Sequence, residues 1–288
     1  MKIVTYNVHY GVGLDGRYDI ARIADAVRDA DLVALQEVSR GNPGNEGRDM
    51  VAELREALPA HFSVYASPFA VDMGSRIEGG RAVDLHFEFG NMVLSRTPIL
   101  SSRNLVLPRR RSLDRLNLQR GALEAMVDTP FGPVRFYSVH LDHRSPDERL
   151  MQVRHLMREA LAYPLTGGAL SGVTEMGFPE PPHPEAFMLL GDFNMLPDGA
   201  EYREICGAPD HEFGTALVMD RAVDAARLAG GGEPAVTCVD LDAPGDEARM
   251  KRIDYGFVSA GLAARVRSTR VDATAAGSDH RPVWFELD

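Results

Sequence analysis

The chain has 288 residues, and 44% of them are hydrophobic, which suffices for a sizeable core in one large domain or two small ones. The formal net charge is -11 and the pI is about 5.3. An acidic surface does not attract a polyanion by its long-range field, which argues against a protein that coats nucleic acid. A local basic patch or bound cations could still bring in a single phosphate.

The cysteine content and the apolar runs indicate the compartment. Cys206 and Cys238 are too few for a disulfide framework, which fits a reducing environment. The first residues read as a strand without a signal-peptide run, and no apolar run reaches the length of a transmembrane helix. We therefore expect a soluble cytoplasmic protein.

The first half of the chain mixes strand-like and helix-like runs. A buried strand is expected at 2–8, and a helix at 19–28, where apolar residues recur at one-face spacing. Residues 31–38 are apolar and β-branched enough for a second strand, and 48–58 predicts a second helix. Five strand-like runs follow one another at 62–65, 89–95, 99–106, 119–128 and 133–141.

The second half begins with a hairpin and a helix start. The sequence TPFG at 129–132 is a turn signal between the last two of those strands. Ser145 is expected to cap a third helix, with Pro146 at its first position and Glu148 completing a capping box. Further strands are expected at 186–193, 253–259, 264–271 and 282–287.

Many strands with interspersed helices and hairpin connections predict the α+β class. The expected architecture is a four-layer α/β/β/α sandwich, in which two packed mixed β-sheets are flanked by helices. Since no linker-like stretch divides the chain, residues 1–288 are expected to form a single domain. The longest expected loops are 67–88 and 164–184, and loops of this length are usually functional or disordered.

Polar residues collect where the expected strands stop. Strand periodicity puts Asp192 and Asn194 on one face and Phe193 on the other, and it puts His140 and Asp142 together. Each residue alone has an ordinary explanation, such as satisfying a turn. As a set they are the residue types of a Mg²⁺ or Mn²⁺ site with a histidine acid or base. The set is Asn7, Glu37, His140, Asp192, Asn194, Asp254, Asp279 and His280.

These residues lie in six stretches: TYNVH at 5–9, LQEV at 35–38, SVHLDH at 138–143, GDFNMLPDG at 191–199, RIDYGFVS at 252–259 and SDHRPV at 278–283. A seventh stretch, GNMVLSRTPI at 90–99, lies between the second and the third of them. In this order they resemble the endonuclease/exonuclease/phosphatase superfamily, the metal-dependent phosphohydrolases related to pancreatic deoxyribonuclease and the apurinic endonucleases. The resemblance covers nearly the whole chain. GDFN and SDHRP with LQE upstream form a specific combination.

The resemblance implies a site for Mg²⁺ or Mn²⁺. Glu37 would be the main carboxylate ligand, with Asn7 beside it as a ligand or a support. Asp279 would contribute to the metal site or orient His280. Whether one or two metal ions bind is left open.

The resemblance also implies catalytic roles. Asp192 would orient or deprotonate the attacking water, and Asn194 would hold a phosphate oxygen or that water. His280 would contact the scissile phosphate, and His140 would bind a non-bridging phosphate oxygen. Asp254 would hydrogen-bond one of these two histidines and fix its tautomer. An aspartate beside an imidazole favours the protonated form of that imidazole.

Two further residues complete the expected substrate-binding set with His140 and Asn194. Arg120 begins an apolar strand, where a charged group needs a partner. Asn91 could reach the substrate or serve as a turn amide. The arginine run at 109–111 is expected to be a solvated loop rather than an anion-binding patch.

Together these features predict a divalent-metal-dependent hydrolase of phosphoester bonds, that is, a phosphodiesterase, a phosphatase or a nuclease. The acidic charge, with Lys2 and Lys251 as the two lysines, favours a small phosphodiester or phosphomonoester. A nucleotide, a phospholipid headgroup and an inositol phosphate are all candidates. The alternative is an endonuclease or exonuclease acting on DNA or RNA, a partner that the charge disfavours.

Two other classes of protein fit the sequence less well. A silent binding module would lack a key site residue, and none is missing. A phospholipase of the sphingomyelinase type would need an exposed apolar hairpin, for which the scattered apolar residues of 164–184 are weak support. The substrate and the oligomeric state stay open.

Overall fold

The computed structural model describes residues 1–230, 235–243 and 245–288. Its first large sheet contains both the first and the last strand, and its order is β14-β15-β1-β2-β7-β3, with β4 paired to β7. β1 and β2 run parallel, whereas β1 and β15 run antiparallel. The strands are β1 (Lys2–Asn7), β2 (Leu32–Arg40), β3 (Phe62–Ala66), β4 (Ala70–Asp72), β7 (His86–Ser95), β14 (Val266–Val271) and β15 (Val283–Leu287).

The second large sheet has the order β12-β13-β11-β10-β9-β8. β10 and β11 run parallel, and the other neighbours run antiparallel. The hairpin predicted at TPFG joins β9 to β10. The strands are β8 (Ile99–Val106), β9 (Gly121–Thr129), β10 (Gly132–His140), β11 (Phe187–Asp192), β12 (Ala222–Asp224) and β13 (Asp254–Ser259).

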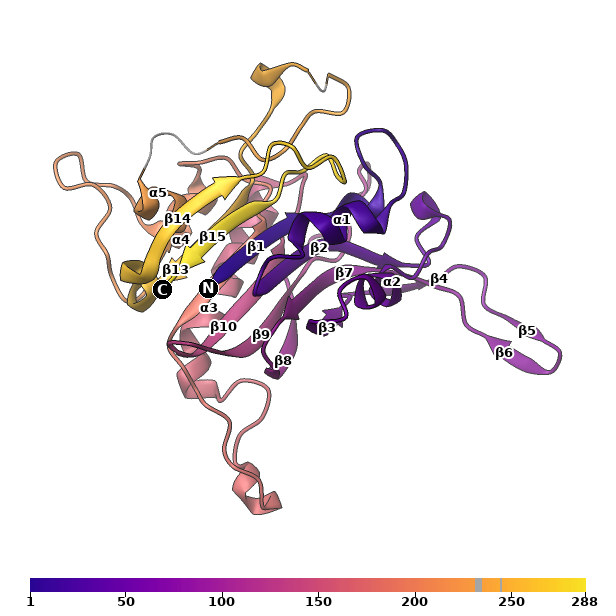
Figure 1. Cartoon of the computed structure of the whole chain (residues 1–288), viewed down its shortest axis with the longest axis horizontal. Helices are drawn as coiled ribbons and strands as arrows, with labels where there is room; N and C mark the ends of the chain where they lie inside the picture. Colours follow the sequence, from indigo (N-terminus) through magenta and orange to yellow (C-terminus); the bar gives the residue numbers. More distant parts are fainter. Residues whose placement is uncertain (231–234, 244) are drawn as a thin grey trace.

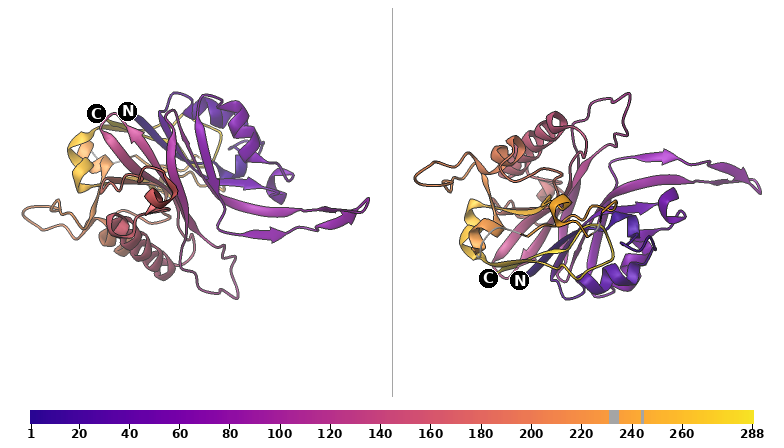
Figure 2. Two further views of the ribbon diagram at one scale, coloured as in Figure 1. Left: turned by 90° about the horizontal axis from the view of Figure 1, so that it is seen from below. Right: turned by 90° about the horizontal axis from the view of Figure 1, so that it is seen from above.

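α1 and α2 lie on the outer face of the first sheet, and α3 and α4 lie on the outer face of the second (Figure 1, Figure 2). α5 contacts β13 and β14, and its Ala225 belongs to the core between the sheets. Ile23 of α1 and Leu54 of α2 pack against Val4 and Leu35 of the first sheet. Leu156 of α3 and Tyr202 of α4 pack on the second sheet. The helices are α1 (Ile20–Val27), α2 (Met50–Ala57), α3 (Pro146–Thr166), α4 (Ala200–Cys206) and α5 (Ala225–Ala229). Short 3-10 turns lie at His9–Gly11, Pro43–Asn45, Val173–Met176, Glu247–Arg249 and Ala260–Arg265.

The core between the sheets completes the four layers. Ile3 and Ala34 of the first sheet meet Phe136, Leu190 and Val258 of the second, and all five are buried. Burial of such apolar side chains is the main favourable term in folding. The predicted α/β/β/α sandwich is therefore confirmed. Within the described residues, no helix has the length and apolar character needed to cross a membrane.

The segment 67–88 is a strand-bearing arm rather than the expected loop. β4 pairs with β7, and beyond it β5 (Arg76–Glu78) and β6 (Arg81–Val83) form a hairpin that projects from the sandwich (Figure 1). Gly79 and Gly80 both have positive φ, as the favoured two-residue hairpin turn requires. The Gly79-Gly80 pair is typical of a hairpin turn, whereas the Gly-rich and polar composition of the whole segment predicts a loop.

The start of α3 forms only half of the expected capping box. The Ser145 hydroxyl accepts a hydrogen bond from the Glu148 backbone N–H at 3.2 Å. The Glu148 carboxylate instead accepts from the Asn117 amide at 3.0 Å. The backbone N–H of Ser145 donates to Asp142 Oδ1 at 2.6 Å. Asp142, which was expected to share a face with His140, therefore accepts a hydrogen bond from the residue that caps α3 and stabilises the start of this helix.

Gly191 permits close contact between two strands at the end of β11. Its φ is +150°, and an added Cβ would lie 1.9 Å from the carbonyl oxygen of Val139 on β10.

We therefore expect Gly191→Ala to lower the free energy of unfolding by about 3 kcal/mol or more. Urea unfolding followed by circular dichroism measures this. Gly261→Ala, which meets no atom within 4 Å, is the control and should stay within about 1 kcal/mol of wild type. Equal midpoints for the two variants would contradict the account.

Candidate active site

The polar strand ends meet at one edge of the sandwich because of the strand registers. His140 ends β10 and lies opposite Asp192, which ends the parallel strand β11. Asp254 begins the antiparallel strand β13 and lies opposite Asp192 on its other side. Asn7 ends β1 in the first sheet. Four side chains far apart in sequence thus collect at one place.

An open cleft of about 430 Å³ lies over these strand ends. Asn7 and Asp254 lie beneath it, each about 1% exposed. Its lining includes seven residues expected from the sequence: Glu37, Arg120, His140, Asp192, Asn194, Asp279 and His280. It also includes eight residues that the sequence did not single out: His9, Tyr10, Asn42, Phe87, Phe89, Leu116, Leu118 and His143.

Glu37 reaches the cleft because β2 contains a bulge. The register of β2 against β7 shifts between Leu35 and Val38, and Glu37 has a φ of +61°. Leu35 and Val38 both pack toward the helices, so the extra residue turns Glu37 away from that layer. Its carboxylate accepts a hydrogen bond from Asn7 Nδ2 at 3.2 Å. Burial raises the pKa of Glu37, although the nearby His9 and His280 oppose this.

Asn7 joins carboxylates that come from different sheets. Its Nδ2 donates to Glu37 Oε1 of the first sheet and, at 3.0 Å, to Asp192 Oδ2 of the second. Its Oδ1 accepts from the His9 backbone N–H at 3.0 Å. Asn7 is therefore oriented with its amide nitrogen toward the acidic groups.

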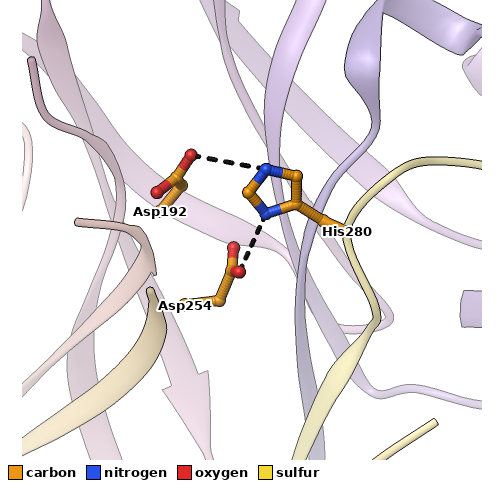
Figure 3. Close-up of side chains that lie close together, drawn as sticks. All are labelled: Asp192, Asp254 and His280. Carbon is orange, nitrogen blue, oxygen red and sulfur yellow. Dashed lines mark hydrogen bonds and ion pairs between the residues drawn. The ribbon is translucent and has the colours of Figure 1, made fainter. Parts of the chain in front are cut away.

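His280 lies between two aspartates (Figure 3). Its Nδ1 donates to Asp254 Oδ2 at 2.8 Å, and its Nε2 lies 3.8 Å from Asp192 Oδ2. The Thr237 hydroxyl donates to the same Asp254 oxygen at 2.7 Å. All four residues are buried. Thr237 was not anticipated, because it lies outside every motif and reaches the site through backbone contacts beside His280.

The environment gives the two site histidines opposite charge states. Burial acts to lower the pKa of His280, but the negative charges of Asp254 and Asp192 raise that pKa well above the ordinary value. Burial, followed by the positive charges of Arg120 and His280, holds the pKa of His140 well below the ordinary value. Burial raises the pKa of Asp192 to about 7, with His280 opposing. One histidine is thus cationic and the other neutral at neutral pH.

Two groups of side chains are candidates to hold a metal ion. Asp192, Asp254 and His280 offer ligand atoms within 4.8 Å of one another. A protonated His280 that donates to Asp254 has no free lone pair for a metal, so these three form an acid–base group joined by the His280–Asp254 hydrogen bond and the His280–Asp192 ion pair. Glu37 and Asp279 present carboxylate oxygens to the cleft, and oxygen donors fit Mg²⁺ or Mn²⁺.

Arg120 is a buried cation whose hydrogen bonds, in the described part of the chain, go to imidazoles. Its side chain is 4% exposed. One guanidinium nitrogen lies 2.9 Å from His140 Nε2, and another donates to His143 Nδ1 at 2.9 Å. Because a guanidinium cannot accept, His143 must carry its proton on Nε2. Burial and Arg120 lower the pKa of His143 to about 4.

Asn91 and Asn194 differ in their relation to the cleft. Asn194 lines it at a φ of +50°, and its backbone N–H donates to Asp192 Oδ1 at 2.9 Å. Phe193 turns into the core, as predicted. Asn91 is 2% exposed and donates from β7 to the Gly121 carbonyl of β9 at 2.9 Å. Asn91 therefore links the two sheets, and it lines a small pocket beside the cleft together with Arg120 and His140.

A hydrolytic phosphoesterase is the class of protein that this fold and this set of side chains fit. The endonuclease/exonuclease/phosphatase family model matches residues 4–280, and the chain belongs to that family. It is therefore a phosphohydrolase of this family. The predicted resemblance is confirmed. No curated protein gives a significant match.

Solved structures share this fold at low sequence identity. An endonuclease/exonuclease/phosphatase protein from Beutenbergia cavernae is 22% identical, with a TM-score of 0.66, and the match covers 100% of this chain and 71% of that one. A mannosyl-6-phosphatase from Bacteroides thetaiotaomicron is 18% identical (TM-score 0.63; 100% and 99% covered). A 3'-5' exonuclease from Neisseria meningitidis is 19% identical (TM-score 0.59; 100% of both chains covered).

Replacing Asp254 by Asn removes the charge that holds the proton on His280. We expect the pKa of His280 to fall in Asp254→Asn, measured by an NMR pH titration of the imidazole in metal-free protein. The folded-state pKa of His280 is raised, so its contribution to stability is present at low pH and is lost as the pH rises through that value. Stability should thus decline less at alkaline pH in the variant. Asp147→Asn on the exposed start of α3 is the control, and an unchanged His280 titration in Asp254→Asn would refute the coupling.

Proposed function

We propose that this chain hydrolyses small phosphodiesters or phosphomonoesters with Mg²⁺ or Mn²⁺. Nucleotides, phospholipid headgroups and inositol phosphates are the candidate substrates. The observation that carries the proposal is the buried Asp254–His280–Asp192 group, which faces Arg120 and His140 in one cleft. This arrangement supplies a base, a cation and phosphate-oxygen donors together.

Asp192 is the proposed base for the attacking water. Its pKa of about 7 allows it to accept a proton near neutral pH. Asn7 and the backbone of Asn194 donate to its two oxygens, so its orientation is fixed. Asn194 would also position the water or a phosphate oxygen.

The positive groups are proposed to hold the phosphoryl oxygens. His280 is cationic and adjoins the base, so it can stabilise the charge that develops on phosphorus-bound oxygen. Arg120 would attract a phosphate oxygen, and the His140 ring nitrogen that carries the proton would donate to a second one. Asp254 acts by keeping His280 oriented and protonated.

Glu37 and Asp279 are proposed to hold the metal ion, with Asn7 as the support that orients Glu37. A bound divalent cation would neutralise phosphoryl oxygens and lower the pKa of a bound water. Asn91 stays a proposed substrate contact, because it lines a small pocket with Arg120 and His140, although its amide nitrogen donates to Gly121. We further propose that residues 1–288 act as one domain in the cytoplasm, where the free Cys206 and Cys238 would stay reduced.

The surface charge supports a small substrate over nucleic acid. The net charge is -11, and in the exposed arginine-rich loop Arg110 and Arg115 pair with Asp147 and Asp114. The same fold occurs in a mannosyl-6-phosphatase and in a 3'-5' exonuclease, so a nuclease is the second candidate. Hydrolysis of bis-p-nitrophenyl phosphate and of a plasmid, measured side by side with Mg²⁺ and a metal titration, separates the two. Plasmid cleavage without turnover of small esters would favour the nuclease.

Asp192→Asn removes the proposed base while keeping its shape. We expect kcat on the best small phosphoester to fall roughly 10³-fold, because general-base catalysis contributes 10²–10⁴-fold. Steady-state kinetics measures this, and circular dichroism checks the fold. Asp210→Asn on an exposed loop is the matched control and should leave kcat unchanged. A variant with near wild-type turnover would remove Asp192 from the mechanism.

Glu37→Gln removes the proposed carboxylate ligand. We expect the Kd for Mn²⁺, measured by electron paramagnetic resonance titration of free Mn²⁺, to rise at least about tenfold. Glu56→Gln, on the exposed face of α2, should leave the Kd unchanged. EDTA should abolish hydrolysis in the wild type, and added Mg²⁺ should restore it. An unchanged Kd in Glu37→Gln would place the metal elsewhere.

A further inference from the structure

One wall of the cleft is apolar, in contrast to its charged floor. Phe87 and Phe89 line it from β7, and Leu116 and Leu118 line it from the segment before β9. Leu116 is 66% exposed, so it is not buried in the protein core. Exposed apolar groups gathered at a cleft commonly mark a ligand-binding surface.

The aromatic residues of this wall form a row that begins at the catalytic floor. The ring of Phe89 lies 6.1 Å from that of His140, Phe87 lies 6.1 Å from Phe89, and Phe69 lies 5.5 Å from Phe87. Strand alternation puts Glu88 on the other face of β7, where it pairs with Arg40. The row therefore leads outward from the phosphate position toward the base of the arm.

The two leucines of this wall, Leu116 and Leu118, lie on an anchored loop. Asn117, between the two leucines, donates to the Glu148 carboxylate at the start of α3. Gln119 donates to the Leu107 carbonyl at 2.6 Å. These bonds hold the loop in place, so the apolar wall is formed before a ligand binds. A preformed site loses less entropy on binding than a flexible one.

The cleft is larger than a phosphate group requires. Its volume of about 430 Å³ lies in the range of small-molecule sites. A phosphate beside Arg120 and His140 leaves the rest of this space next to Phe89, which contacts His140. That space is large enough for the organic substituent of the ester.

We propose that Phe87, Phe89, Leu116 and Leu118 bind the substituent of the phosphoester, and that the substrate carries an aromatic or other apolar ring next to its phosphate. Polyhydroxylated substituents, such as those of sugar and inositol phosphates, gain little at this wall because it offers them few hydrogen-bond partners. The proposal rests on the proposed function, since it takes the phosphate to lie beside Arg120 and His140.

Isothermal titration calorimetry of the full chain with Mg²⁺ tests the proposal without turnover. The probes are phenylphosphonate, methylphosphonate and 2-hydroxyethylphosphonate, whose phosphorus–carbon bonds resist hydrolysis. We expect phenylphosphonate to bind at least about tenfold more tightly than the other two, because its ring leaves water. Equal affinity for the phenyl and methyl probes, or tighter binding of the hydroxyethyl probe, overturns the proposal.

Phe87→Ala and Leu116→Ser test the wall itself, and both positions are partly or largely exposed, so folding should be retained. We expect Phe87→Ala to reduce the phenyl preference to about twofold and Leu116→Ser to reduce it in part. Phe62→Ala, at the opposite end of the β3–β7 pair and 54% exposed, should leave the preference unchanged. An undiminished preference in Phe87→Ala refutes the assignment. If no probe binds and no phosphoester is hydrolysed, the proposed function itself fails.

Discussion

The site depends on buried polar contacts that join the two sheets at one edge. Asn7 Nδ2 of the first sheet lies 3.0 Å from Asp192 Oδ2 of the second, and Gln36 Nε2 donates to Ser138 Oγ at 2.9 Å across the same interface. A buried polar group that loses its partner costs about 1–3 kcal/mol, so the sheets are held in the alignment that satisfies these bonds. The hydrophobic effect is non-directional and does not by itself select one alignment of the two sheets. Hydrogen bonds require a particular geometry, so these polar contacts select the alignment and fix the spacing of the carboxylates.

The charged neighbours of the two buried histidines give them different pKa values. His280 and His140 are both nearly inaccessible, and both lie beside Asp192, but His280 also donates to Asp254, whereas His140 contacts the guanidinium of Arg120. The first is held protonated and the second neutral, so the cleft contains a charged and an uncharged imidazole at the same pH. This separation of pKa values is what acid–base chemistry at neutral pH requires. It arises from contacts between strands that are distant in the sequence.

The sequence predicted most of the fold, because strands buried on both faces are nearly continuous apolar runs and the amphipathic helices show clear periodicity. It also predicted which strand ends are polar, since carboxylates and histidines stand out after apolar runs. The contacts made through tertiary structure could not be predicted. Thr237 bonds to Asp254 from a stretch without a motif, and Asn91 is turned toward Gly121 by the packing of two sheets. His143 belongs to the stretch SVHLDH, but its hydrogen bond to Arg120 depends on the folded arrangement.

The bulge at Glu37 has a consequence for how this site can vary during evolution. Before the bulge, odd-numbered residues of β2 such as Leu35 face the helices, and after it the even-numbered Val38 does so. Insertion or deletion of one residue here would reverse the facing of every later side chain in the strand. A one-residue insertion or deletion would therefore move the Glu37 carboxylate and, at the same time, turn core side chains such as Val38 away from the helices. We therefore expect the number of residues between Leu35 and Val38 to stay constant, since a change of length would move both the Glu37 carboxylate and the core side chains that follow it.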